Sequence, residues 1–295
     1  MKLTTNLKNA SRAALQWRLL LIWLGAVLLP VLLMALPVWS TLSSSLDRSV
    51  HAAALAQQLD LATLADLMAE VRRNGAAIHG GGIAALVFTL LLSPFLTGVA
   101  VTAARSHETA RFRELFAGGV AEYPRMFRML VWGVLLLAAA GALGGQLIEM
   151  ADKHGEQAIL QSEAHLWKHA AAIVLALLLA LVNATLDAGR AELAIDRRRT
   201  SAVKAWWRGV KLLWQNPAAA LGIYLGVTLV GLLAVALLAV LRVNIAGSNA
   251  GLLIAAFLVT QLIALVLAWM RATRLFALMT VSAADKAMQH SQIVH

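Results

Sequence analysis

Two histidines stand four residues apart, at His165 and His169, and this spacing places both imidazoles on one face of a helix. Imidazoles arranged in this way can bind zinc, and Glu149, Asp152 and His154 come shortly before them in the chain. No Glu stands between the two histidines, so the metalloprotease motif is not matched. We expect no metal site, with His165 and His169 as the candidate ligands if one exists, because neutral imidazoles are also at home at a lipid–water boundary.

Four polar side chains lie within long apolar runs or at their ends: Ser93, Asn183, Asp187 and Gln261. Polar residues at such positions mark substrate paths in membrane proteins, so these four could line a polar path between helices. The alternative is structural pairing, in which Asp187 forms a salt bridge and Gln261 hydrogen-bonds to a neighbouring helix. The arginines that could pair with Asp187 are Arg190, Arg271 and Arg274.

Motifs of catalysis and of cofactor binding are missing from the sequence. The chain has no Cys, which excludes thiolate catalysis and iron–sulfur ligation. It has no Walker loop, no dinucleotide-binding glycines after a strand and no G-x-S-x-G motif. We therefore expect no enzyme activity and no cofactor.

The composition requires a lipid environment for the elements that carry these side chains. Of the 295 residues, 60% are hydrophobic and 14% are charged, and the mean hydropathy is +0.75. A soluble domain has about 45 to 50% apolar and about 25% charged residues. Runs of about 20 apolar residues, long enough to cross a bilayer as helices, occur six times. They cover 19–39, 83–104, 129–148, 170–186, 218–241 and 252–270. The sequence predicts one all-α, polytopic transmembrane domain over 1–295.

Positive charge is distributed unevenly between the two sides of these six spans. If the spans alternate in direction, 19 of the 25 Lys and Arg residues fall on the side that also holds both termini. Because positive charge accumulates on the cytoplasmic side of membrane proteins, we expect both termini in the cytoplasm. Topology and attraction to anionic lipid then account for the net charge of +10, and we expect no nucleic-acid partner.

Three segments on the basic side have the pattern of amphipathic helices. In 111–127 and 201–216 apolar residues recur every three or four positions, and the N-terminal stretch repeats this more weakly. Such helices would lie in the inner membrane interface, with rings in the acyl boundary and cations toward headgroups. The residues expected at the membrane interface are Phe112, Phe116, Trp206, Trp207 and Trp214. Those expected at lipid headgroups are Lys204, Arg208 and Lys211, with Arg197, Arg198 and Arg199.

The order of interfacial helix, span, outer loop and span occurs three times, in 1–104, 105–190 and 191–295. Gly119 and Gly209 stand at matching places in the second and third units, which indicates a pseudo-threefold repeat. The first outer loop, 40–82, is predicted to form two amphipathic helices that end at a glycine run at 80–82. This loop would be either a lid over the spans or a docking surface for a partner.

Two pairs of glycines stand four residues apart within spans. They are Gly141 with Gly145, and Gly222 with Gly226. Small residues at this spacing allow two helices to approach closely. We expect them to pack against helices of the same chain, with a dimer face as the alternative.

Three short motifs connect the chain to a known group of proteins. LDRS at 46–49, FRELF at 112–116 and DRRRTS at 196–201 resemble a loose group of poorly characterised bacterial six-span inner-membrane proteins. This group includes the membrane domain attached to some glycerophosphoryl diester phosphodiesterases. Their hydrolase domain is missing here, so the resemblance implies a fold and a bacterial inner-membrane location, with no activity or catalytic residue.

These observations support two hypotheses of function. The first is a non-enzymatic inner-membrane protein that organises membrane lipid or a partner protein. The second is a transporter or permease subunit with a polar path along Ser93, Asn183, Asp187 and Gln261.

Overall fold

The computed structural model describes residues 3–46, 75–106, 109–157, 161–198, 200–245 and 249–293, and within these ranges all regular secondary structure is helical. The helices are α1 (Leu3–Ala14), α2 (Trp17–Leu46), α5 (Gly75–Arg105), α6 (Phe112–Gln157), α7 (Gln161–Ile195), α8 (Ala202–Gln215), α9 (Pro217–Asn244) and α10 (Ala250–Ile293). The all-α prediction is confirmed for the part of the chain that the structure describes.

Six of these helices, all except α1 and α8, are long and apolar enough to cross a membrane. Between 11% and 33% of the residues in the most apolar window of each helix are buried. Most of their apolar surface is therefore exposed, as a lipid environment requires and water would penalise. The predicted multi-pass membrane architecture is confirmed.

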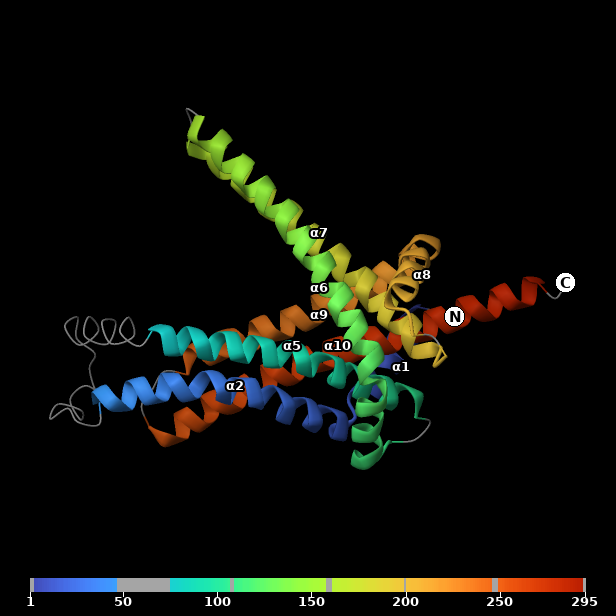
Figure 1. Cartoon of the computed structure of the whole chain (residues 1–295), viewed down its shortest axis with the longest axis horizontal. Coiled ribbons are helices and arrows are strands. Elements are labelled where there is room, and N and C mark those ends of the chain that lie inside the picture. Colours follow the sequence, from blue (N-terminus) through green and yellow to red (C-terminus); the bar gives the residue numbers. More distant parts are fainter. Residues whose placement is uncertain are drawn as a thin grey trace.

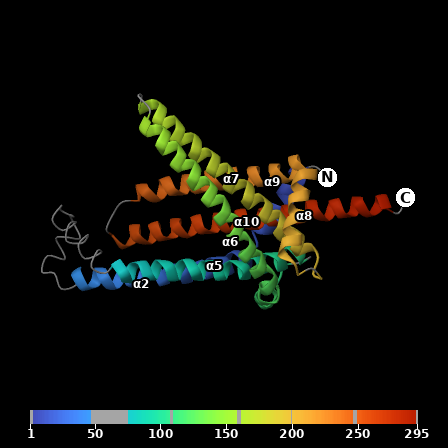
Figure 2. The ribbon, with the colours of Figure 1, turned by 45° about the horizontal axis from the view of Figure 1, so that its top comes forward.

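The long helices form two groups. Helices α2, α5, α9 and α10 run side by side, whereas α6 and α7 form a hairpin that crosses them obliquely (Figure 1 and Figure 2). Both short helices and both chain termini lie toward one end of this assembly, which we call the α1/α8 end. Fully buried side chains such as Leu115, Met129, Leu193 and Leu278 make this end the hydrophobic core.

Pairs of glycines bring helices together near the α1/α8 end. A Cβ atom on Gly98 of α5 would lie 2.9 Å from the carbonyl oxygen of Gly119 in α6. A Cβ atom on Gly209 of α8 would lie 2.5 Å from the backbone nitrogen of Gly189 in α7. The beginning of α6 thus packs on α5, and α8 packs on α7, at distances that no larger residue permits.

Helix α1 packs on α10, far away in the sequence. The Asn6 side chain is buried, and its amide donates a hydrogen bond of 3.2 Å to the carbonyl oxygen of Ala277. Thr280 donates from its hydroxyl to the Asn6 amide oxygen. Both ends of this amide are therefore satisfied inside the protein, which fixes the position of α1.

The second predicted interfacial helix does not exist as a separate element. Residues 112–127 are the beginning of α6, which continues without a break to Gln157 and contains Pro124. In the third unit, by contrast, Asn216 leaves the helical conformation immediately before Pro217, because proline disfavours the helical conformation in the residue before it. In α6 the helix continues through Tyr123 and Pro124 and runs on into the span.

Two expectations about glycines are wrong. The glycine run at 80–82 lies inside α5, and a Cβ atom on Gly81 would lie 2.6 Å from the Pro37 ring in α2. This glycine permits close helix contact and ends no helix. Added Cβ atoms on Gly141, Gly145 and Gly226 would have nothing within 4 Å, so these glycines do not pack against other helices of the chain.

Candidate functional site

Asp187 and three arginines form a cluster between the long helices. Asp187 Oδ1 is 2.6 Å from Nη1 of Arg190, which follows it in α7, and Asp187 Oδ2 is 3.4 Å from Nε of Arg274 in α10. The side chains of Asp187, Arg190 and Arg274 are 11% to 17% exposed, so these ion pairs are largely desolvated. The expected salt bridge of Asp187 is confirmed, and both of its oxygens are occupied.

Arg274 has two further contacts, both in α9. Its Nη1 donates a hydrogen bond of 3.2 Å to the Thr228 hydroxyl, and its guanidinium lies 4.9 Å from the centroid of the Tyr224 ring. Contact between a cation and the face of an aromatic ring is favourable, more so where water is excluded. Arg274 therefore connects α7, α9 and α10.

The third arginine, Arg271, is oriented differently. Its guanidinium lies 5.8 Å from the centroid of the Trp23 ring in α2, and Nη2 is 3.5 Å from the Ser93 hydroxyl in α5. Arg271 and Trp23, together with Asp187 and Arg190, line a cavity of about 20 Å³. This volume holds about one water molecule, so the cluster is almost closed.

The four polar residues proposed to form a path are not brought together. Ser93 and Asp187 both belong to the arginine cluster. The Asn183 amide instead donates to the carbonyl of Leu179 within α7, at 2.9 Å. Gln261 is half-buried in α10 and belongs to no cavity of the cluster. This arrangement gives the transporter hypothesis less support than the sequence did.

A second ionic cluster lies where α5, α6 and α7 meet. Glu122 of α6 receives Nη1 of Arg105 on one oxygen and Nη1 of Arg125 on the other, each at 2.5 Å. Arg105 also donates to the carbonyl oxygen of Ala194 from Nε at 2.9 Å, and Arg125 donates to that of Leu193 at 2.6 Å. These carbonyls belong to the last turn of α7, where no intrahelical donor remains. One carboxylate thus holds two arginines that cap α7.

A third buried carboxylate, Glu192, connects α7 to α10. It accepts a hydrogen bond from the Ser282 hydroxyl, and its second oxygen lies 2.8 Å from Lys286 Nζ. Glu122 and Glu192 both stand on the basic side of the predicted topology. An acidic residue among many cations indicates in the sequence that an ion pair can form, but it does not show which cations the carboxylate meets.

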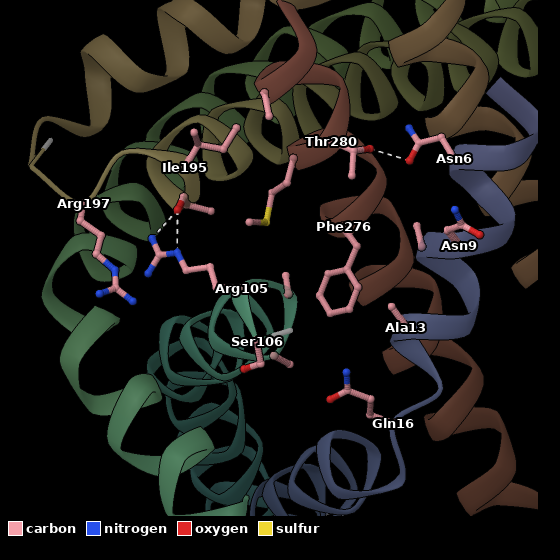
Figure 3. A pocket seen from close by; sticks show the side chains of 16 residues that line it. Asn6, Asn9, Ala13, Gln16, Arg105, Ser106, Ile195, Arg197, Phe276 and Thr280 are labelled. Atoms are coloured by element: carbon pink, nitrogen blue, oxygen red, sulfur yellow. Dashed lines mark hydrogen bonds between the residues drawn. The ribbon is translucent and has the colours of Figure 1, made fainter. Parts of the chain in front are cut away.

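A cavity of about 620 Å³ opens at the α1/α8 end, between α1 and the last turns of α5 and α7 (Figure 3). Figure 3 shows Asn9 and Gln16 on the α1 side, facing Arg105, with Phe276 of α10 between them. Arg197, which is exposed, also lines this cavity. The volume is that of a small-molecule site, and amide and guanidinium groups could orient a polar ligand there.

Helix α8 has three chemically different sides. The side formed by Ala202, Ala205, Gly209 and Leu212 is buried against the protein. A second side is apolar but exposed: Val203 is 48%, Trp207 54% and Trp214 87% exposed. The third side is basic and exposed, and consists of Lys204, Arg208 and Lys211.

Trp206 differs from the other predicted interface residues. It is half-buried, its Nε1 donates a hydrogen bond of 3.1 Å to the Thr185 hydroxyl, and its ring contacts that of Trp132 at 5.6 Å. Trp206 therefore holds α8 against the protein and does not lie on the exposed aromatic side. Phe112 and Phe116 are 39% and 49% exposed, and their position at the membrane interface stays a prediction.

The two spaced histidines do not form a metal-binding arrangement. The His165 and His169 rings are 6.4 Å apart, and Nδ1 of His169 lies 2.6 Å from the backbone carbonyl of His165. Glu149 pairs with Lys153 at 2.8 Å, and Asp152 with Lys168 at 3.0 Å. Among the residues that the structure describes, no three His, Cys, Asp or Glu side chains are grouped to hold a metal ion.

Some predicted features fall outside the described ranges. They include Arg199 and most of the outer loop, so neither the headgroup contact of Arg199 nor the lid can be placed. Arg197 and Arg198 are both exposed next to the end of α7, as a contact with headgroups requires.

Comparison with known proteins gives no relative of this chain. No protein-family model matches it, and no curated protein or solved structure is significantly similar to it. The resemblance to bacterial six-span membrane proteins therefore stays a prediction. Function has to be argued from the geometry alone.

Proposed function

We propose that this protein is a non-enzymatic, multi-pass protein of the bacterial inner membrane that organises anionic lipid of the inner leaflet. The observation that carries this proposal is the division of α8 into a packed, an aromatic and a basic side. An isolated amphipathic helix has two sides, one for lipid and one for water. A helix that also packs against the rest of the protein needs a third side for that contact.

The three sides of α8 suit a helix that lies in the interface plane. At 100° per residue, the packed, aromatic and basic sides each occupy about a third of the helix circumference. If the packed side faces α7, the aromatic side can enter the acyl boundary while the basic side reaches the headgroups. Each cation close to an anionic surface contributes about 1 kcal/mol of attraction.

We place the α1/α8 end in the cytoplasm. Lys204, Arg208 and Lys211 are exposed there, and Arg197 and Arg198 add two exposed cations close by. Cations flanking spans accumulate on the cytoplasmic side, and the anionic lipids of the inner leaflet attract them. Both termini then lie in the cytoplasm, because both are at this end.

The proposal includes a pseudo-threefold repeat. The beginning of α6 packs on α5 through Gly98 and Gly119, and α8 packs on α7 through Gly189 and Gly209. Helix α1 packs on α10, the second span of the third unit. Each unit would thus contribute one amphipathic segment that packs on the last helix of another unit. The second unit packs on the first, the third on the second, and the first on the third.

Lipid fits α8 better than a protein partner does. The centre of a protein interface is enriched in aromatic side chains and depleted of lysines, because each buried charge has to be paired. On α8 the aromatic and basic sides are adjacent and both exposed over the whole helix. That combination matches the boundary between acyl chains and anionic headgroups.

The test removes the three charges on the basic side of α8. The variant Lys204→Gln, Arg208→Gln, Lys211→Gln is reconstituted into bilayers that contain spin-labelled phosphatidylglycerol or phosphatidylcholine. The preference of the wild-type protein for phosphatidylglycerol is read from the motionally restricted lipid fraction. We expect the triple variant to lose at least about a factor of five in this preference, which corresponds to one surface cation.

The matched control neutralises three exposed cations away from the α1/α8 end. In Lys153→Gln, Lys168→Gln, Arg242→Gln the total charge changes by the same amount. This variant is expected to keep the wild-type preference. If both triple variants lose the preference equally, net charge alone governs lipid selection. If both keep it, the cations of α8 do not select lipid. Either result would mean that the assignment of α8 is wrong.

A further inference from the structure

A groove of about 350 Å³ runs along the outside of α2 and α5. Its lining is almost entirely apolar and includes Val27, Pro30 and Met34 of α2, with Leu86 and Leu92 of α5. Arg271 of α10 is the one charged side chain among its lining residues. An apolar groove that ends in a guanidinium has two chemically distinct halves.

The guanidinium lies at one end of this groove. Arg271 contacts Trp23 and Ser93, whereas the far end is formed by Met34 and Ala85. Met34 follows Trp23 by eleven positions in α2, a length of about 16 Å along a helix. Half of the hydrocarbon core of a bilayer measures about 15 Å. The groove therefore has the length of the acyl region of one leaflet.

Arg271 is available for a ligand, whereas the other arginines of its cluster are not. The Asp187 carboxylate is taken by Arg190 and Arg274, and no ion pair of Arg271 is found within the described part of the chain. The Arg271 side chain is exposed at the groove. Three arginines face one carboxylate here, so the cluster has an excess of positive charge.

An unpaired guanidinium at the edge of the membrane core is costly, and a phosphate is the anion that matches its planar donors best. The Ser93 hydroxyl, 3.5 Å from Arg271 Nη2, supplies an additional donor at the same place. A molecule with a phosphate at one end and an acyl chain extending from it satisfies both halves of the groove.

We propose that this groove binds one anionic glycerophospholipid of the inner leaflet, with its phosphate on Arg271 and an acyl chain between α2 and α5. The proposal deepens the proposed function and rests on its premise that the protein binds anionic lipid. It concerns a different surface, because the groove contains no residue of α8. The two can therefore fail separately.

The experiment counts the lipids that stay bound to the protein. The full chain is released from nanodiscs of phosphatidylcholine with a minor fraction of phosphatidylglycerol, and native mass spectrometry reads the retained lipids. We expect the wild-type protein to retain one phosphatidylglycerol that Arg271→Gln loses, while Arg242→Gln, an exposed cation elsewhere, retains it. Equal retention by Arg271→Gln and the wild-type protein would overturn the proposal.

A pair of variants tests the acyl chain. Leu86→Trp narrows the groove, whereas Leu91→Trp obstructs an apolar pocket on the α6 side of α5, which has no cation in its lining. We expect only Leu86→Trp to lose the lipid. Both variants keep Arg271, so loss in both, or in neither, would contradict a chain seated between α2 and α5.

Two further arms separate the sources of phosphate and the two sites. Added glycerol 3-phosphate carries the headgroup chemistry without chains, and we expect no displacement of the bound lipid. Displacement would show that the groove binds soluble phosphates, and it would overturn the proposal that its ligand is a phospholipid. The α8 triple variant is expected to retain the lipid in the groove. Loss of this lipid from the triple variant would show that α8 and Arg271 form a single site, which would contradict a separate groove site.

Discussion

Glu122→Gln is expected to give a large loss of stability, because this one carboxylate pairs with two buried arginines. The glutamine keeps the size of the side chain but removes the only charge that Arg105 and Arg125 share. All three side chains are 18% exposed or less, so the two guanidiniums would stay desolvated while losing the carboxylate that lies 2.5 Å from each of them. Breaking a buried pair in this way costs about 3 kcal/mol or more. Thermal unfolding of the purified protein in detergent measures it.

The matched control is Glu149→Gln. Glu149 also pairs with a cation on its own helix, but the Glu149 and Lys153 side chains are 67% and 68% exposed. An exposed pair of this kind contributes about 0 to 1 kcal/mol, so the midpoint of unfolding should barely move. An equal loss in both variants would mean that the Glu122 cluster is not the desolvated junction described above.

The second prediction compares the same substitution, glycine to alanine, at two positions. We expect it to destabilise the protein at one position and not at the other. In Gly209→Ala the new Cβ atom would lie 2.5 Å from the backbone nitrogen of Gly189 and 2.8 Å from the carbonyl carbon of Ala188. Backbone atoms cannot rotate away, so α8 has to move off α7. Overpacking of this kind costs about 1 to 3 kcal/mol.

In Gly226→Ala the new methyl group has nothing within 4 Å. Alanine is a better helix former than glycine by about 1 kcal/mol, so this variant should be as stable as the wild-type protein or slightly more stable. Thermal unfolding of both variants under one condition provides the measurement. A stabilised Gly209→Ala would refute the close packing of α7 and α8.

The spans were predictable because lipid imposes one simple requirement on the sequence. A helix in hydrocarbon needs about 20 apolar residues in a row, and α2 or α9 can be read directly from such a run. The pairing of Asp187 with Arg190 was predictable for a local reason, since residues three apart share a helix face.

The Glu122 cluster was not predictable, because its partners come from three helices. Arg105, Arg125 and the last carbonyls of α7 meet only after α5, α6 and α7 have packed, and no spacing in the sequence encodes that meeting. The side of α8 that faces the protein was missed for another reason. Periodicity separates apolar from charged positions, but it does not distinguish apolar residues that face lipid, such as Trp207, from those that face protein, such as Leu212.

The roles of the glycines also depend on tertiary structure. Gly81 was expected in a turn and serves a helix contact, and Gly145 was expected in a contact and has none. Glycine permits a turn, a close approach or neither, and the neighbouring helix decides between them. The sequence shows at which glycines a neighbouring helix can come close. The packing of the helices determines at which of them it does.

The hydrogen bond between Asn6 and Ala277 has a consequence for how the chain is made. Its two partners are 271 residues apart, so at ribosomal speed α1 leaves the ribosome roughly 15 to 50 s before α10 exists. During that interval the Asn6 amide has only water or headgroups to bond to. Helix α1 is thus synthesised well before α10 but can dock only after it, so α10 has to be inserted before the packing at the α1/α8 end is complete.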